Sequence, residues 1–144
     1  MQVKEILRNK GSEVVVIAGD ATLAEAARLL SRKQIGAVVV RDMGGSLAGI
    51  LSERDLVRAL AKDSIGALTQ SVRSYMTKHV ATCTEFDTVD HLMEMMTRGR
   101  FRHVPVLDEE DEVIGIISIG DVVKTRIEET EYEARSLRDY IATG

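Results

Sequence analysis

The feature that most constrains this chain is an internal duplication with a spacing of 66 residues. Residues 22–57 align with residues 88–123 without a gap, and ten of those 36 positions carry the same amino acid. Ordinary composition would give only about two identities by chance in such a window. The whole chain has 144 residues, and small domains bury a low fraction of their surface. The sequence therefore predicts two similar halves that share a core and leave clefts between them.

Hydrophobic patterning predicts the same order of elements in both halves: strand, helix, strand, hairpin, strand, helix. In the first half these elements are a strand at 13–18, a helix opened by a Thr22–Glu25 capping box, strands at 35–40 and 47–51, and a helix at 52–62. The last helix is expected to bury Leu56, Val57 and Leu60.

The chain outside the duplicated window completes the predicted division. Its parts are an N-terminal helix at 1–12, a first repeat at 13–63, a linker and lead-in at 64–78, a second repeat at 79–125 and a C-terminal helix at 126–144. The C-terminal helix has a sparse apolar seam that includes Ile127, Leu137 and Ile141. This seam suits either a helix folded on its own half or a contact in a dimer.

Each half contains a Ser-x-x-Asp segment where a strand runs into a helix: Ser52 with Asp55, and Ser118 with Asp121. A serine at this position caps a helix by accepting a hydrogen bond from a free first-turn N–H. A helix start also offers free N–H groups and a positive dipole end to a phosphate. An aspartate beside them can accept two hydrogen bonds from a ribose diol. Both interpretations remain open for one segment, but its repetition favours a ligand site.

Composition excludes several classes of function. A net charge of −4 provides no basic field for nucleic acid, and 3% aromatic residues provide few platforms for base stacking. No apolar run approaches the roughly 20 residues that span a bilayer, and the N-terminus lacks the apolar core of a signal peptide. The single cysteine, Cys83, fits a reducing compartment, so we expect a cytoplasmic protein without membrane contact.

Catalytic and metal-binding patterns are missing as well. The three histidines have no cysteine or carboxylate partners at zinc-ligand spacing, so no metal is expected. We find no nucleophile–base pair and no Walker-type glycine-rich loop, which argues against an enzyme.

A duplicated unit with Gly-Ile-x-Ser-x-x-Asp at each strand-to-helix junction resembles the CBS domain pair, or Bateman module. Residues 72–77 also match the segment that usually leads into a second CBS repeat, and residues 104–108 match the family's usual strand sequence. The resemblance covers residues 13–124, nearly the whole chain, and fits the stand-alone two-CBS type. It implies an α/β (α+β) fold: a tandem pair of β-α-β-β-α repeats packed sheet to sheet with pseudo-two-fold symmetry.

The family resemblance also implies a ligand, an adenosine nucleotide bound in two clefts between the repeats. AMP comes first, and ADP, ATP, NAD(H) and S-adenosylmethionine are alternatives. Asp55 and Asp121 would hold ribose hydroxyls, with Ser52 and Ser118 beside the ribose-phosphate. In the family's pattern each adenine pocket borrows the other repeat's first strand and an apolar wall, which here correspond to Val15, Val16, Ile35, Val80, Ala81 and Phe101.

The positions that would contact phosphate differ between the repeats. Arg54 in the first repeat corresponds to Gly120 in the second, while Arg102 in the second corresponds to Gly36 in the first. His103 follows Arg102. Because Arg102 and Asp121 share a repeat, we expect the Asp121 cleft to use Arg102 and the Asp55 cleft to rely on Arg54. Arg102 as a solvated charge, and His103 as a strand-edge imidazole, are the simpler alternatives.

Two functions remain open. The first is a sensor that binds an adenine nucleotide and acts in trans on a regulated protein that the sequence does not identify. The second is a scaffold or dimerisation module without a ligand, in which the Ser-x-x-Asp segments are only helix caps. The resemblance implies a homodimer in either case.

Overall fold

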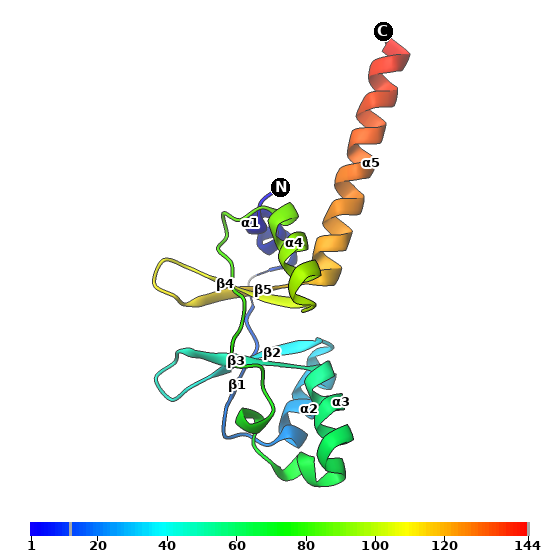
Figure 1. Cartoon of the computed structure of the whole chain (residues 1–144). Helices are drawn as coiled ribbons and strands as arrows, with labels where there is room; N and C mark the ends of the chain where they lie inside the picture. The colour runs from blue at the N-terminus through cyan, green and yellow to red at the C-terminus, as the bar shows by residue number, and fades with distance from the viewer. Residues whose placement is uncertain (12, 144) are drawn as a thin grey trace.

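The computed structural model describes residues 1–11 and 13–143 of the chain. It consists of two lobes whose sheets face each other, with helices on the outer faces (Figure 1). The first lobe holds a three-stranded sheet and the second a two-stranded sheet. The predicted α/β fold with two repeats packed sheet to sheet is confirmed.

The first lobe follows the predicted order closely. Its elements are β1 (Val16–Ala18), α2 (Leu23–Lys33), β2 (Ala37–Arg41), β3 (Leu47–Ser52) and α3 (Glu53–Asp63). Strand β2 lies in the centre, parallel to β1 and antiparallel to β3. Thr22 and Glu25 form the predicted capping box of α2. The helix buries Leu23, Ala26 and Leu30 against the sheet, as its spacing requires.

The second lobe repeats this arrangement with one strand fewer. Its elements are α4 (Val89–Gly99), β4 (His103–Leu107), β5 (Val113–Ser118) and α5 (Ile119–Thr143). In place of β1 a single parallel bridge joins Cys83 to Val106, 66 residues beyond the Ile17–Val40 pair. The Thr84 amide donates to Asp87 Oδ2 (2.7 Å). The chain turns directly after the bridge, and the first strand predicted for this half does not form.

Helix α1 (Val3–Lys10) contributes to the core of the second lobe, although it precedes the first lobe in sequence. Its buried face is Val3, Ile6 and Leu7. The Val3 amide donates to the Asp87 carbonyl (2.9 Å), which fixes the start of the helix beside α4. The chain must then cross to the first lobe after Gly11. It returns through two short 3-10 helices, η1 (Ser64–Thr69) and η2 (Val72–Ser74).

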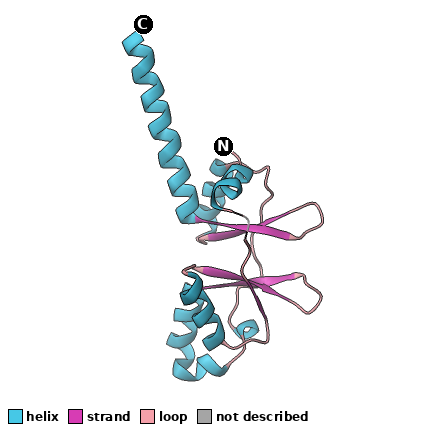
Figure 2. Cartoon of the chain, turned by 180° about the vertical axis from the view of Figure 1, so that it is seen from behind, coloured by secondary structure: helices cyan, strands magenta, loops and turns pink. Residues whose placement is uncertain are grey.

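Two helices keep apolar residues on the surface. Helix α3 buries Asp55 and Ala59, whereas Val57 is 66% and Leu60 is 42% exposed. The prediction that Val57 and Leu60 face the core was therefore wrong, because the helix turns its Asp55 side to the sheet. Helix α5 continues past the repeat as one 25-residue helix that projects from the molecule (Figures 1 and 2). Of the helices described, none has the length and apolar character needed to cross a membrane.

Candidate functional site

In both lobes the Ser-x-x-Asp segment caps the helix that follows it. At α3 the Asp55 amide donates to Ser52 Oγ (3.3 Å) and the Ser52 amide donates to Asp55 Oδ2 (2.9 Å). At α5 the Asp121 amide donates to Ser118 Oγ (3.1 Å) and the Ser118 amide donates to Asp121 Oδ2 (2.9 Å). The hydrogen bonds of a capping box are thus present twice. Each carboxylate has two oxygens and about four acceptor positions, so it can still accept from a further donor.

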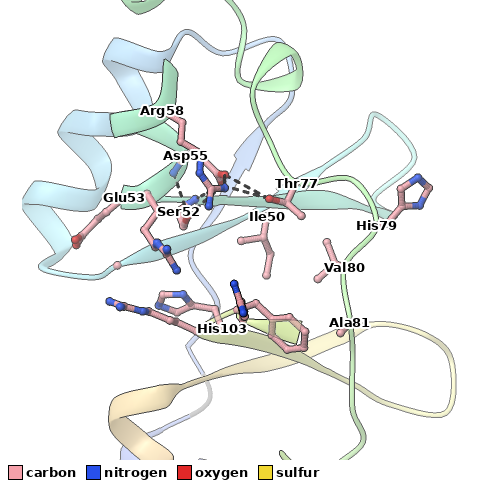
Figure 3. Close-up of a pocket in the computed structure, with 15 residues that line it drawn as sticks. Ile50, Ser52, Glu53, Asp55, Arg58, Thr77, His79, Val80, Ala81 and His103 are labelled. Carbon is pink, nitrogen blue, oxygen red and sulfur yellow. Dashed lines mark hydrogen bonds and ion pairs between the residues drawn. The ribbon is translucent and has the colours of Figure 1, made fainter. Parts of the chain in front are cut away.

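The first cleft lies between the lobes, beside the start of α3 (Figure 3). Ser52 and Asp55 line one side of it. Val80 and Ala81, on the segment that returns to the second lobe, line another, and Phe101 approaches from the second lobe. Asp55 is only 6% exposed. The cleft therefore joins a largely buried carboxylate to apolar walls that can contact a flat ring.

Four arginines line the first cleft, two from each lobe: Arg54, Arg58, Arg100 and Arg102. Among the described residues, the lining includes two carboxylates, those of Glu53 and Asp55. Arg58 Nη1 is 3.7 Å from Asp55 Oδ1, and the Arg58 side chain is 70% exposed, so this ion pair is weak and leaves the guanidinium available. Guanidinium groups bind phosphate through two parallel hydrogen bonds. The cleft can therefore hold an anionic group beside a carboxylate that suits a diol.

His103 lies between the two clefts and lines both of them. Burial is the main cause that lowers its pKa, and the positive charges of Lys10 and Arg102 act in the same direction. Glu53 and Asp121 oppose this shift without cancelling it. The imidazole is therefore neutral at pH 7. A Cβ atom at Gly36 would lie 3.2 Å from His103 Nε2, so the glycine gives the ring its space.

The second cleft lies on the other side of His103, and Lys10, Val15, Ile35 and Ser118 are among its lining residues. Lys10 Nζ donates to the Ile116 carbonyl (2.9 Å) and to Asp121 Oδ2 (2.7 Å). Burial alone would raise the pKa of Asp121. The hydrogen bonds from Lys10 and Ser118 outweigh burial and hold that pKa below its ordinary value.

The fourteen residues predicted for the site divide between these clefts. Nine line the first cleft: Gly36, Ser52, Arg54, Asp55, Val80, Ala81, Phe101, Arg102 and His103. Val15, Ile35 and Ser118 line the second, together with Gly36 and His103. Asp121 adjoins the second cleft through Lys10. Val16 lies in β1, is 40% exposed and lines neither.

One predicted pairing was wrong. Arg102 lines the cleft of Asp55, which belongs to the other lobe, and is not among the residues that line the second cleft. The residues leading into β4 face across the interface between the lobes, so they cover the helix start of the opposite repeat.

Sequence reasoning also missed several lining residues of the first cleft. Arg58 follows Arg54 by one helical turn, and Arg100 lies two residues before Arg102. Those two signals were available. Thr77, and Lys10 in the second cleft, carry no local signal because their contacts span distant parts of the chain.

Comparison with protein families now identifies the fold. The sequence matches the family described as CBS domain over residues 3–62 and 72–128. The chain belongs to the CBS domain family. Its two CBS repeats are the two lobes, and helix α1 falls within the first matched range although it packs on the second lobe.

Solved CBS structures share the architecture of most of this chain. The CBS-domain containing protein ATU1752 from Agrobacterium tumefaciens is 52% identical, with a TM-score of 0.84 over 87% of this chain and 92% of its own. The CBS domain pair of protein MJ0100, solved with 5'-methylthioadenosine and S-adenosyl-L-methionine, is 27% identical, with a TM-score of 0.80 over 90% of this chain and 98% of its own. The CBS domain protein PAE2072 from Pyrobaculum aerophilum, complexed with AMP, is 26% identical, with a TM-score of 0.74 over 84% of this chain and 89% of its own.

CBS repeats also occur within larger enzymes. Inosine-5'-monophosphate dehydrogenase of Methanocaldococcus jannaschii is 30% identical over 79% of this chain, but the match covers only 22% of that enzyme. The matched part of such an enzyme is therefore a minor share of its length. Within residues 1–11 and 13–143, no three His, Cys, Asp or Glu side chains converge as a metal site would require.

Proposed function

We propose that this chain is a regulatory CBS pair that binds an adenine nucleotide in the first cleft and acts in trans on a separate protein. The proposal rests above all on one observation: the largely buried Asp55 carboxylate adjoins a cleft lined by four arginines from both lobes. The CBS pairs solved with AMP and with S-adenosyl-L-methionine support the adenosine class of ligand.

Each part of an adenine nucleotide has a counterpart in the first cleft. The ribose hydroxyls donate to the Asp55 carboxylate, and Ser52 lies beside the ribose-phosphate. The adenine ring packs between Val80, Ala81 and Phe101, whose contact with a flat ring stabilises it by removing apolar area from water. The guanidinium groups pair with phosphate. This last feature favours AMP, ADP, ATP or NAD(H) over S-adenosylmethionine, which has no phosphate.

A homodimer is part of the same proposal. Val57 on α3 and Val123 on α5 occupy equivalent positions in the two repeats, and they are 66% and 46% exposed. Ile127 continues the face of α5 and is 53% exposed. Apolar faces of this kind are typical of an interface between protein chains. A second copy of this chain presents the same two faces and can cover them by two-fold symmetry.

We further propose that the module has no catalytic activity, contacts no nucleic acid or membrane and works in the cytoplasm. Its response to the nucleotide would then reach the regulated protein through contact between the two proteins. Affinity purification with and without AMP, followed by mass spectrometry, would identify a protein whose capture depends on the nucleotide.

The direct test is a binding panel on protein shown by mass spectrometry to be free of carried-over ligand. Adenine ligands should raise the melting temperature, and GMP should do so less. A ligand at 100 times its dissociation constant adds about 2.7 kcal/mol to the stability of the fold. For a domain of this size the melting temperature should rise by several degrees. A melting temperature unchanged by AMP, ADP, ATP and NADH would contradict the proposal.

The alternative, a scaffold without ligand, is favoured by one observation. Both Ser-x-x-Asp segments do cap their helices, so capping alone gives them a role. The two functions differ in what the Asp55 carboxylate charge contributes, because asparagine caps a helix about as well as aspartate. A variant with asparagine at this position therefore distinguishes them.

A further inference from the structure

The two clefts of this chain differ in the group that donates a hydrogen bond to the aspartate proposed to bind ribose. In the first cleft this group belongs to Thr77, whose amide donates to the Ile50 carbonyl (2.8 Å). Its hydroxyl lies 3.4 and 3.5 Å from the two Asp55 oxygens, which makes a weak interaction. A ribose hydroxyl can displace a neutral donor held so loosely.

In the second cleft the Lys10 ammonium makes both contacts, the one to the strand carbonyl and the one to the carboxylate. Ile116 and Asp121 are the counterparts of Ile50 and Asp55 in the duplication, and Lys10 Nζ bonds to both, at 2.9 and 2.7 Å. The contact with Asp121 is a short charge-assisted hydrogen bond, with side-chain exposures of 38% for Lys10 and 22% for Asp121. A ribose would have to break this pair to reach the carboxylate.

The second cleft also lacks the positive charges that would offset that cost. Its counterparts of Arg54, Arg100 and Arg102 are Gly120, Gln34 and Gly36, and Lys124, the counterpart of Arg58, is not among its lining residues. Glu13 stands where the first cleft has His79. A nucleotide phosphate in the second cleft would therefore meet a carboxylate and a lysine that is already paired.

We propose that Lys10 determines which cleft binds nucleotide: its ammonium closes the second cleft to ribose, so that each chain holds one nucleotide, in the first cleft. This inference rests on the proposed function, since it concerns the same ligand class. Helix α1 holds Lys10 in place, because Val3, Ile6 and Leu7 are packed in the core of the second lobe and Lys10 is the last residue of that helix.

The test counts nucleotides per chain by calorimetry and native mass spectrometry, with AMP as the probe. The wild-type chain should bind one AMP. Lys10→Met removes the ammonium and keeps a long unbranched side chain, so it should bind a second AMP at least tenfold more tightly than the wild type does. Lys4→Met is the matched control, because Lys4 is on the same helix but lies 5.6 Å from the Phe86 ring, away from both clefts. It should bind one AMP.

A second measurement needs no ligand. Carbon NMR of the Asp121 carboxyl should report a higher pKa in Lys10→Met than in the wild type, because the variant loses the ammonium that stabilises the carboxylate. An unchanged pKa would show that the pair does not form and would overturn the proposal.

The binding outcomes separate this inference from the proposed function. Two AMP molecules of similar affinity on the wild-type chain would refute the role of Lys10 and leave the function standing. Binding of a single AMP by Lys10→Met would also refute the role of Lys10. A second AMP that binds Lys10→Met more weakly than it binds the wild type would refute that role too, because Lys10 would then be a phosphate ligand. No AMP on either protein would refute the proposed function, and the single-nucleotide stoichiometry with it.

Discussion

Replacing Asp55 by asparagine separates ligand binding from helix capping. In the folded protein the Asp55 carboxylate accepts hydrogen bonds from the Ser52 amide (2.9 Å) and the Ser52 hydroxyl (3.1 Å). An asparagine side-chain oxygen can accept the same two bonds. The remaining contacts are the weak one from the Thr77 hydroxyl (3.4 and 3.5 Å) and the ion pair with Arg58, which is 3.7 Å long and involves a 70% exposed guanidinium. Pairs of this kind contribute about 0–1 kcal/mol.

The stability of the ligand-free protein should therefore change little. A loss below about 1 kcal/mol corresponds to a few degrees in melting temperature for a domain of this size. Binding should change far more, because the diol of the ribose loses a charged acceptor with two oxygens. Hydrogen bonds to charged groups contribute roughly 1.5–3 kcal/mol, which corresponds to about a 10- to 150-fold loss of AMP affinity.

Calorimetry with AMP and thermal melting without ligand should be run on the wild type, Asp55→Asn and Asp20→Asn. Asp20 is exposed and lines neither cleft, so its variant reproduces the charge change alone. It should bind AMP like the wild type. If Asp55→Asn keeps the full AMP affinity of the wild type, the carboxylate charge contributes nothing to binding, Asp55 is only a helix cap and the reasoning fails.

Three further predictions address the arginines, the dimer and the buried histidine. Arg102→Ala should weaken AMP more than adenosine, because only AMP has a phosphate, and calorimetry should show this gap shrinking between about 0.05 and 0.5 M salt; equal losses for both ligands would contradict a phosphate contact. Val57→Asp and Val123→Asp should each convert the homodimer into a 15.9 kDa monomer in light scattering, and a monomeric wild type would refute the interface. The pKa of His103 is lowered below 6.5 in the folded chain, so the unfolded chain binds more protons in the window between the two values. Stability should fall as the pH drops below about 6.5, and the decline should be shallower in His103→Gln when urea melts are compared; parallel pH profiles would show that another group is responsible.

The duplication made much of the fold predictable. The spacing of 66 residues relates the Ile17–Val40 pair to the Cys83–Val106 bridge, so even the strand register repeats. The capping function of Ser52 and Ser118 follows from local chemistry, and it is present at both helix starts. Predictions of this type succeed because they depend on residues a few positions apart.

Contacts between the lobes were harder to predict from the sequence. Which cleft Arg102 lines depends on how the two sheets face each other, and no local sequence pattern around Arg102 records that arrangement. The Lys10–Asp121 pair joins residues 111 positions apart and exists because α1 packs on the lobe that follows later in the chain. Val57 and Leu60 misled the helix prediction for a related reason: apolar spacing identifies a face, but another protein chain can cover it as well as the core can.

Helix α5 begins at the residue after Ser118 and continues as a single 25-residue rod. At about 1.5 Å per residue the rod is roughly 37 Å long, and most of it projects beyond the lobe (Figures 1 and 2). The helix starts directly after Ser118, which lines the second cleft. A tilt of the helix by about 5° about this start would displace its far end by about 3 Å, which is as long as a hydrogen bond. The geometry of α5 would thus magnify a small rearrangement between the lobes into a displacement that another protein can detect.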